Sequence, residues 1–190
     1  MSRLRARYEE SGRFYHTWNH IEQLVAEYQT IESKITHKQS VLCAIYYHDA
    51  VYDVTSGDNE ENSAKLFREE VAPLIDQNIA LLSERMIVAT KAHECPQFDD
   101  PASECDCKYF LDIDMSILGA NRVDYDAYAA NVRREYSIFE DAVYSVGRSR
   151  VLKEFPGRER LFFTDEFFSR YDEKARVNIS RELAGLESEF

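Results

Sequence analysis

The sequence has few residues that interrupt regular secondary structure, with only 6 glycines and 4 prolines in 190 residues. This composition disfavours a loop-rich all-β protein and favours long regular elements. The sequence also lacks an apolar run that approaches the roughly 18 residues of a membrane span, and no apolar signal core follows its first residues. Because there are only 4 cysteines as well, we expect a soluble cytoplasmic protein with reduced thiols.

Positive charge is scarce, since 23 Lys and Arg residues stand against 35 Asp and Glu residues and the formal net charge is −12. An acidic surface repels a phosphate polymer, so we expect no binding to polymeric DNA or RNA. A small phosphorylated metabolite is not excluded as a ligand, because a metal ion and a few arginines make the electrostatic potential within one pocket positive. The chain length suits one domain over residues 1–190, and 12 Tyr and 11 Phe supply surface to bury.

Apolar residues recur at helical spacing along most of the chain, and no segment reads convincingly as a strand. We therefore predict an all-α helical bundle of about seven or eight helices in a single domain. Residues 1–16 are polar and aromatic, residues 94–104 are predicted to form a loop, and Asp58 with Glu61 is predicted to form a capping box. The predicted helices run from residue 17 or 19 to 31, then over 36–52, 58–71, 77–93, 105–119, 123–139 and 141–154, and from residue 164 or 165 to the end.

Four polar residues fall on the inward faces of three predicted helices, namely His20, His48, Asp49 and Asp114. Helical phase points Asp114 inward rather than Asp112, which we expect to be solvated or salt-bridged. A carboxylate aimed into apolar surroundings needs a cation or hydrogen-bond donors, because otherwise its burial costs several kcal/mol. Imidazole nitrogens together with carboxylates suit Zn, Mn, Fe or Ni. The sequence therefore predicts a metal site.

Six stretches of the sequence form a recognisable set of motifs. They are RFYHTWNH at 13–20, HDAVYD at 48–53, DNEENSA at 58–64, ATKAH at 89–93, FLDIDMSILG at 110–119 and RREY at 133–136. Together these stretches resemble the motifs of the HD-domain superfamily of metal-dependent phosphohydrolases, in particular a bacterial branch of predicted hydrolases. The resemblance covers nearly the whole chain and implies an all-α HD-domain-like bundle with one divalent metal ion, which would be Mn, Zn, Fe, Co, Ni or Mg. It implies that His20, His48, Asp49 and Asp114 are the ligands.

The same resemblance implies hydrolysis of a phosphoester or phosphoanhydride in a small phosphorylated metabolite, with nucleotides as one candidate class, through a metal-activated water. In related hydrolases an acidic residue shortly after the His-Asp pair orients that water. Asp53 occupies the last position of this motif, whereas Tyr52 replaces a second acid. Glu60 or Glu61 of the next helix would supply the missing acid, so Asp53 and Glu60 are the expected catalytic residues.

Five further residues are expected to contact the substrate: Arg13, His16, Lys91, His93 and Arg133. The positively charged side chains of Arg13, Lys91 and Arg133 would neutralise negative charge on the transferred phosphoryl group in the transition state. His16 precedes His20 by four residues, so both would share a helical face, and His93 ends the inward stripe of its helix. Three of these residues have a structural alternative: Arg13 as a surface residue, Arg133 as a partner of its neighbours and His93 as a core histidine.

Other interpretations of the sequence are less favoured. Dinuclear relatives carry two extra histidines before the last ligand, and only His93 is offered here, so we expect one metal ion and disfavour a two-iron oxygenase. His93 with Cys95, Cys105 and Cys107 lacks the two-residue gaps of a structural zinc site. The main alternative is a non-enzymatic module that binds a nucleotide or a partner protein and keeps the metal for structure. We expect no membrane partner, and a homo-oligomer stays open.

Overall fold

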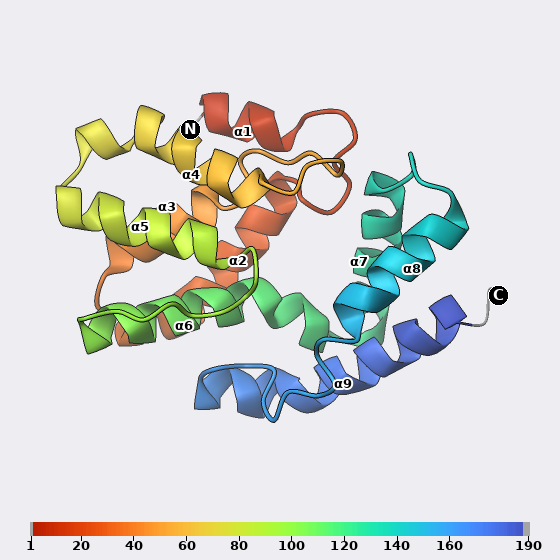
Figure 1. Cartoon of the computed structure of the whole chain (residues 1–190). Helices are drawn as coiled ribbons and strands as arrows, with labels where there is room; N and C mark the ends of the chain where they lie inside the picture. Colours follow the sequence, from red (N-terminus) through yellow and green to blue (C-terminus); the bar gives the residue numbers. More distant parts are fainter. Residues whose placement is uncertain (1, 188–190) are drawn as a thin grey trace. The chain divides into compact units, whose positions relative to one another are not determined.

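The structure is a computed structural model that describes residues 2–187, and within this range it is all-helical without a strand (Figure 1). The predicted all-α class is confirmed. Three short 3-10 helices accompany the α-helices: η1 (Glu32–Lys34), η2 (Ala72–Leu74) and η3 (Ser116–Gly119). The α-helices are α1 (Ser2–Tyr8), α2 (Trp18–Ile31), α3 (Lys38–Tyr47), α4 (Asn59–Glu70), α5 (Gln77–Ala89), α6 (Pro101–Met115), α7 (Arg122–Glu135), α8 (Asp141–Leu152) and α9 (Asp165–Glu187).

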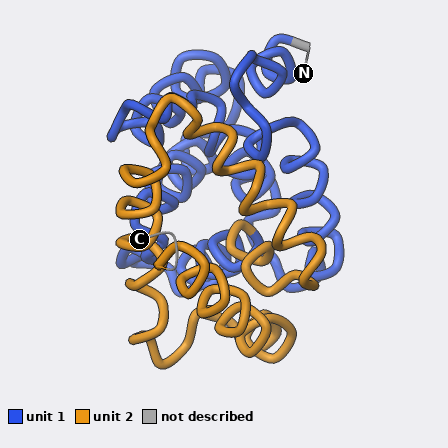
Figure 2. Tube along the Cα trace, turned by 90° about the vertical axis from the view of Figure 1, so that its right-hand side faces the viewer, with its two compact units in different colours: residues 1–113 blue, residues 114–190 orange. Residues whose placement is uncertain are grey.

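The chain divides into two compact units at the junction of Ile113 and Asp114, which lies in the last turn of α6 (Figure 2). In the first unit, α5 packs against both α3 and α4, and α2 packs against α3. In the second unit, α9 packs against η3 and α8, and α7 packs against η3. None of the described helices combines the length and the apolar character needed to cross a membrane.

The predicted inward stripe of α2 is confirmed. This helix buries His20, Leu24, Tyr28 and Ile31, which recur every three or four residues. His20 lies in the first turn, where its imidazole is only 2% exposed. A polar ring at a core position of this kind needs a partner, which makes it the first candidate for a functional side chain.

Helix α3 ends at Tyr47, five residues before the predicted end at Tyr52. The reason is tertiary, because the backbone groups that would continue the helix are bound by other segments. Arg13 donates to the carbonyl oxygens of Asp49 and Ala50, and the Ser63 hydroxyl accepts from the amide of Val51. The His-Asp pair therefore lies in the turn after α3, with His48 as the C-cap residue.

Helix α6 begins at Pro101, inside the segment that the sequence indicated to be a loop. The Asp100 carboxylate accepts hydrogen bonds from the amides of Ala102 and Ser103, so it caps the helix, and Pro101 occupies the first position that proline favours. Asp106, which is fully buried, then accepts from the amides of Thr36 and His37 and fixes α6 to the start of α3. The last turn of α6, which carries Asp114, is thus an extension of a helix anchored in the first unit.

Several smaller predictions were wrong. Helix α5 ends at Ala89, four residues before its predicted end at His93, and α1 forms within the first 16 residues, where no helix was predicted. Asp58 precedes α4 without a side-chain cap, because its carboxylate accepts from the Ser56 hydroxyl instead. On α9 the buried face begins at Phe167, whereas Phe168, which was predicted to point inward, is 37% exposed.

Gly119 ends η3 where this segment meets α9. A Cβ atom at this position would lie 2.5 Å from the Cβ of Tyr171, closer than any real side chain allows. The glycine predicted to end the fifth helix is therefore required by close packing within the second unit. Nearby, the side-chain amide of Asn178 donates to the carbonyl oxygens of Leu118 and Ala120 and holds the same segment on α9.

Candidate metal centre

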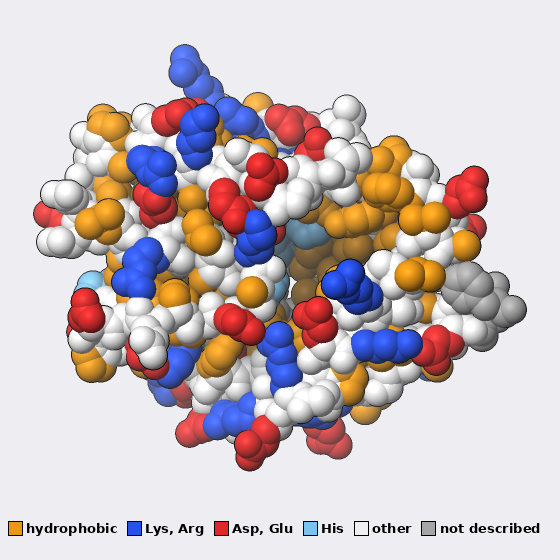
Figure 3. All heavy atoms as spheres, in the orientation of Figure 1, with side chains coloured by type: hydrophobic (Ala, Val, Ile, Leu, Met, Phe, Trp, Pro, Cys, Tyr) orange, Lys and Arg blue, Asp and Glu red, His pale blue; other side chains and the backbone are white. Residues whose placement is uncertain are grey.

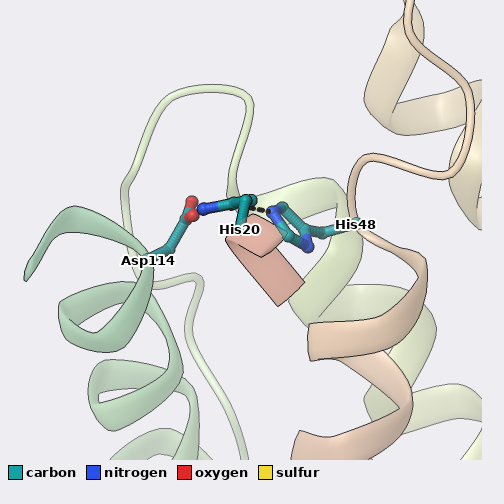
Figure 4. A group of neighbouring side chains, drawn as sticks. All are labelled: His20, His48 and Asp114. Atoms are coloured by element: carbon teal, nitrogen blue, oxygen red, sulfur yellow. Dashed lines mark hydrogen bonds between the residues drawn. The ribbon is translucent and has the colours of Figure 1, made fainter. Parts of the chain in front are cut away.

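Three of the four predicted metal ligands lie together. One ligand atom each from His20, His48 and Asp114 falls within 4.8 Å of the other two. Figure 4 shows the carboxyl group of Asp114 and the two imidazole rings turned toward one another. These side chains come from the start of α2, the end of α3 and the last turn of α6. Helical phase therefore pointed to the aspartate of α6 that lies in this group.

The fourth predicted ligand, Asp49, lies against the same two rings. Its Oδ2 atom is 2.9 Å from Nε2 of His48 and 3.8 Å from Nε2 of His20. The two Nε2 atoms are themselves 3.3 Å apart. The histidine side chains are almost completely buried, whereas the Asp49 side chain is 16% exposed. The two histidines of this group are thus shielded from solvent, whereas Asp49 is partly accessible to it.

The tautomer of His48 follows from its surroundings. Its Nδ1 atom lies 3.0 Å from the carbonyl oxygen of Ile45, and a carbonyl oxygen only accepts, so Nδ1 carries the hydrogen. In the neutral ring, Nε2 then presents a lone pair to the carboxylate of Asp49. A backbone carbonyl that orients an imidazole in this way is the usual support of a metal-binding histidine.

Three atoms that can each donate an electron pair converge here, namely Nε2 of His20, Nε2 of His48 and Oδ2 of Asp49. A proton shared between two of these atoms forms one hydrogen bond and does not involve the third atom. A divalent cation instead accepts electron density from all three atoms. A cation about 2.1 Å from two nitrogens places those nitrogens roughly 3.0 to 3.4 Å apart. The observed separation of 3.3 Å agrees with this requirement. The donor set of imidazoles and carboxylates fits zinc, manganese, iron, cobalt or nickel.

His16 lies at the solvent-facing side of the cluster. It belongs to the turn before α2 rather than to the same helix as His20, and its Nε2 is 3.9 Å from Oδ2 of Asp49. Its ring lies over that of Tyr52, with the centroids 4.2 Å apart and the planes 30° apart. The His16 side chain is 20% exposed, so it contacts both the cluster and solvent.

The two expected catalytic acids differ in their surroundings. Glu60, in the first turn of α4, is half-buried, and this burial raises its pKa, assisted by the negative charges of Asp49 and Glu61. Asp53 is exposed, and its carboxylate accepts from the hydroxyl and the amide of Thr55. These bonds lower the pKa of Asp53. Glu60 is therefore the stronger base and lies within the electrostatic reach of Asp49.

The expected substrate-binding cations have partners of their own. The Lys91 ammonium is 2.5 Å from a carboxylate oxygen of Glu61, and this bond raises the pKa of Lys91. Arg133, in the second unit, binds the carboxylate of Asp141 and donates to the carbonyl oxygen of Tyr136 at 2.9 Å. Arg13 is buried. It donates to the carbonyl oxygens of His16 and Asp49, which lie in the two turns next to the candidate ligands.

His93 does not continue α5. It follows the end of the helix with a φ of 47°, the left-handed region that a non-glycine residue rarely adopts. It is half-buried in the segment between α5 and α6. Backbone strain of this kind concentrates at functional positions, which agrees with the expected role of His93 at the substrate but does not test it.

Two features of α6 were not visible in the sequence. Asp112 is fully buried, so of its two expected environments the solvated one was wrong, whereas the salt bridge stays a prediction. Its burial follows from the near-complete enclosure of this helix, in which Phe110, Leu111 and Ile113 are also fully buried. The neighbouring cysteines do not form a metal site in the described part of the chain, where His20, His48 and Asp114 are the group found. The Cys95 thiol instead donates to the carbonyl oxygens of Pro96 and Glu104, and the neighbouring Cys107 thiol lowers the pKa of Cys95.

Acidic and basic side chains are interspersed over the molecular face in Figure 3. This mixture agrees with the many surface ion pairs, such as those of Arg68 with Glu84 and Lys38 with Glu32. A nucleic-acid polymer binds best to a continuous basic groove. The drawn face instead carries the two signs side by side.

Comparisons with models of known protein families, with curated proteins and with solved structures found no match. The HD-type resemblance therefore rests on the motifs of the sequence and stays a prediction. The chemistry of the site has to be inferred from its own residues.

Proposed function

We propose that this protein is an HD-type, metal-dependent phosphohydrolase that cleaves a phosphoester or phosphoanhydride bond in a small phosphorylated metabolite. One observation carries the proposal. The Nε2 atoms of His20 and His48, 3.3 Å apart, meet Oδ2 of Asp49, and Asp114 lies within reach of both rings. This arrangement of lone pairs is suited to a divalent cation.

A divalent cation held by His20, His48, Asp49 and Asp114 would supply a Lewis acid, which lowers the pKa of a water molecule and polarises a phosphoryl oxygen. The chain's own contribution begins with Glu60, which is half-buried near Asp49. A carboxylate with a raised pKa is a better proton acceptor, so Glu60 would take the proton of the attacking water. Asp53, which is bound to Thr55, would shape the turn between the His-Asp pair and α4.

Substrate charge would be balanced by cations and by His16. Lys91 already lies near the first turn of α4 through its ion pair with Glu61, and both side chains are exposed. A phosphate group that competes with Glu61 for this ammonium would gain a charge-assisted hydrogen bond. His16, partly exposed beside Asp49, would contact the same substrate. The net charge of −12 favours a small substrate over a polymer, because it repels extended phosphate chains.

The first experiment is metal analysis of the purified protein, followed by phosphate or pyrophosphate release from a panel of nucleotides and phosphoesters with added Mn²⁺ or Co²⁺. We expect turnover by the wild-type protein. Glu60→Gln should keep metal binding and lose most of the turnover, because it removes the proton acceptor but no ligand. Stoichiometric metal binding without turnover anywhere on the panel would contradict the proposal.

A second candidate is a non-enzymatic module that binds a nucleotide or a partner protein. The observation in its favour is that Asp53, Lys91 and Arg133 are each bound to neighbours of their own chain. Under this alternative the metal would tie α2, α3 and α6 together. Tight nucleotide binding by calorimetry, combined with bound metal and no hydrolysis, would favour the module over the enzyme.

A further inference from the structure

Arg13 lies beside the candidate metal centre, and its guanidinium group hydrogen-bonds to main-chain carbonyl oxygens. Its side chain is 3% exposed. One guanidinium nitrogen, Nη1, donates to the carbonyl oxygen of Asp49 at 2.7 Å and to that of His16 at 3.2 Å. The other, Nη2, donates to the carbonyl oxygen of Ala50 at 3.2 Å. One buried side chain therefore binds two turns that are more than thirty residues apart in sequence.

Aromatic rings hold this guanidinium in place. The rings of Tyr8 and Tyr52 lie 5.1 Å and 5.4 Å from its central carbon. The Tyr8 hydroxyl donates to the carbonyl oxygen of Tyr46 at 2.8 Å and thereby ties α1 to the end of α3. Tyr52 also stacks on His16. Rings above a cation contribute attraction that increases as water is excluded.

The two turns that Arg13 joins are those that carry the metal ligands. The turn containing His16 leads into α2, where His20 lies four residues later, and the other turn contains His48 and Asp49. If α3 continued, the carbonyl groups of Asp49 and Ala50 would accept from the amides four residues later, those of Asp53 and Val54. The guanidinium binds these carbonyl groups instead and holds the turn in which Asp49 faces the two Nε2 atoms.

We propose that Arg13 is a positioning residue that joins these two turns and so sets the spacing of His20, His48 and Asp49 for a cation. The inference rests on the proposed metal site and assigns Arg13 a role in place of the substrate contact expected from the sequence. It depends on the guanidinium fork, because the three carbonyl oxygens are bound by two separate nitrogens. A lysine offers a single ammonium point and cannot reproduce this geometry.

The test compares Arg13→Lys with the matched control Arg5→Lys, since Arg5 also lies near an aromatic ring but forms an exposed ion pair with Glu9. The first measurement is amide hydrogen exchange of the full-length, metal-free proteins. Arg13→Lys should accelerate exchange at hydrogen-bonded amides in both turns and leave α5 unchanged. The amides to follow are those of Thr17, His20, Ala50 and Val51.

The second measurement is Zn²⁺ affinity by calorimetry. Removing a group that orients metal ligands typically weakens metal binding by about 10- to 100-fold, and we expect a loss of this size for Arg13→Lys. The Arg5→Lys control should bind Zn²⁺ as the wild type does. If Arg13→Lys fails to fold by circular dichroism, Tyr52→Leu replaces it, with faster exchange at the same amides and a smaller loss of affinity expected.

The outcomes separate the two claims. If the folded Arg13 or Tyr52 variant exchanges and binds Zn²⁺ like the wild type, the positioning role is overturned while the metal site stands. If the wild-type protein itself binds no Zn²⁺, the metal site fails and the positioning role fails with it. Faster exchange in both turns together with weaker binding supports the inference.

Discussion

The imidazole of His48 donates from Nδ1 to the carbonyl oxygen of Ile45, three residues earlier on α3, across 3.0 Å. This bond fixes the ring so that Nε2 faces the carboxylate of Asp49 and the ring of His20. A helix C-terminus has carbonyl oxygens without intrahelical partners. A histidine at the C-cap uses one of them as a support and leaves its other nitrogen for a ligand.

Metal removal should lower the stability of the folded protein. A ligand that binds only the native state raises the free energy of unfolding by about 2.7 kcal/mol at a concentration 100 times its Kd. We expect a difference of this size between protein with Zn²⁺ at that concentration and protein in chelator, measured by urea denaturation. Equal stability in both conditions would contradict a site that links α2, α3 and α6.

The two aspartates of α6 provide a matched pair for the ligand assignment. Asp114→Asn removes the carboxylate that we propose as a metal ligand and should reduce Zn²⁺ affinity by at least about 100-fold, because an amide oxygen is a much weaker ligand. Asp112→Asn changes a fully buried carboxyl group of the same helix and should leave the stoichiometry of binding unchanged. Calorimetry of both variants measures this difference, and equal losses of affinity would contradict the assignment.

Replacing Glu60 and replacing Glu61 by glutamine should change the stability of the metal-free protein in opposite directions. Burial raises the pKa of Glu60, so its stabilising contribution is present below its unfolded pKa and is lost as the pH rises through its folded pKa. Glu60→Gln should therefore raise the melting temperature of metal-free protein at pH 7, with the difference vanishing near pH 4. A bond from Lys91 lowers the pKa of Glu61, so its contribution is present at neutral pH and is lost on acidification.

Glu61→Gln should accordingly lower the melting temperature slightly at pH 7, and the difference should vanish in acid. Both variants are to be melted in chelator between pH 4 and pH 7, because a bound cation changes the charge that Glu60 experiences from Asp49. Destabilisation by Glu60→Gln at pH 7 would contradict the burial of its charge.

Two glycines of the second unit test the packing of η3 against α9. Gly119→Ala would place a Cβ 2.5 Å from Tyr171, and such overpacking typically costs about 1–3 kcal/mol. Gly147→Ala, inside α8, has no atom within 4 Å of the new Cβ and should stabilise by about 0.4–1 kcal/mol. Urea denaturation measures both changes, and a neutral Gly119→Ala would show that α9 does not approach η3 this closely.

The sequence by itself determined the helical class and predicted the residues that form the candidate metal group. Its scarcity of glycine and proline favoured long helices, and the three-to-four spacing on α2 placed His20 in the core. The same periodicity separated Asp114 from Asp112 as the residue at the cluster. These features depend on residues close in sequence, since helical phase relates positions within a few turns.

Only the tertiary structure decided where α3 ends and how its histidine is oriented. Helical periodicity would have continued α3 to Tyr52, but Arg13 and Ser63 bind the backbone groups of Asp49, Ala50 and Val51. The burial of Asp112 likewise follows from enclosure of α6 on all sides. A local pattern cannot anticipate such contacts, because a distant side chain that binds a peptide group removes it from the helix, whatever the neighbouring residues prefer.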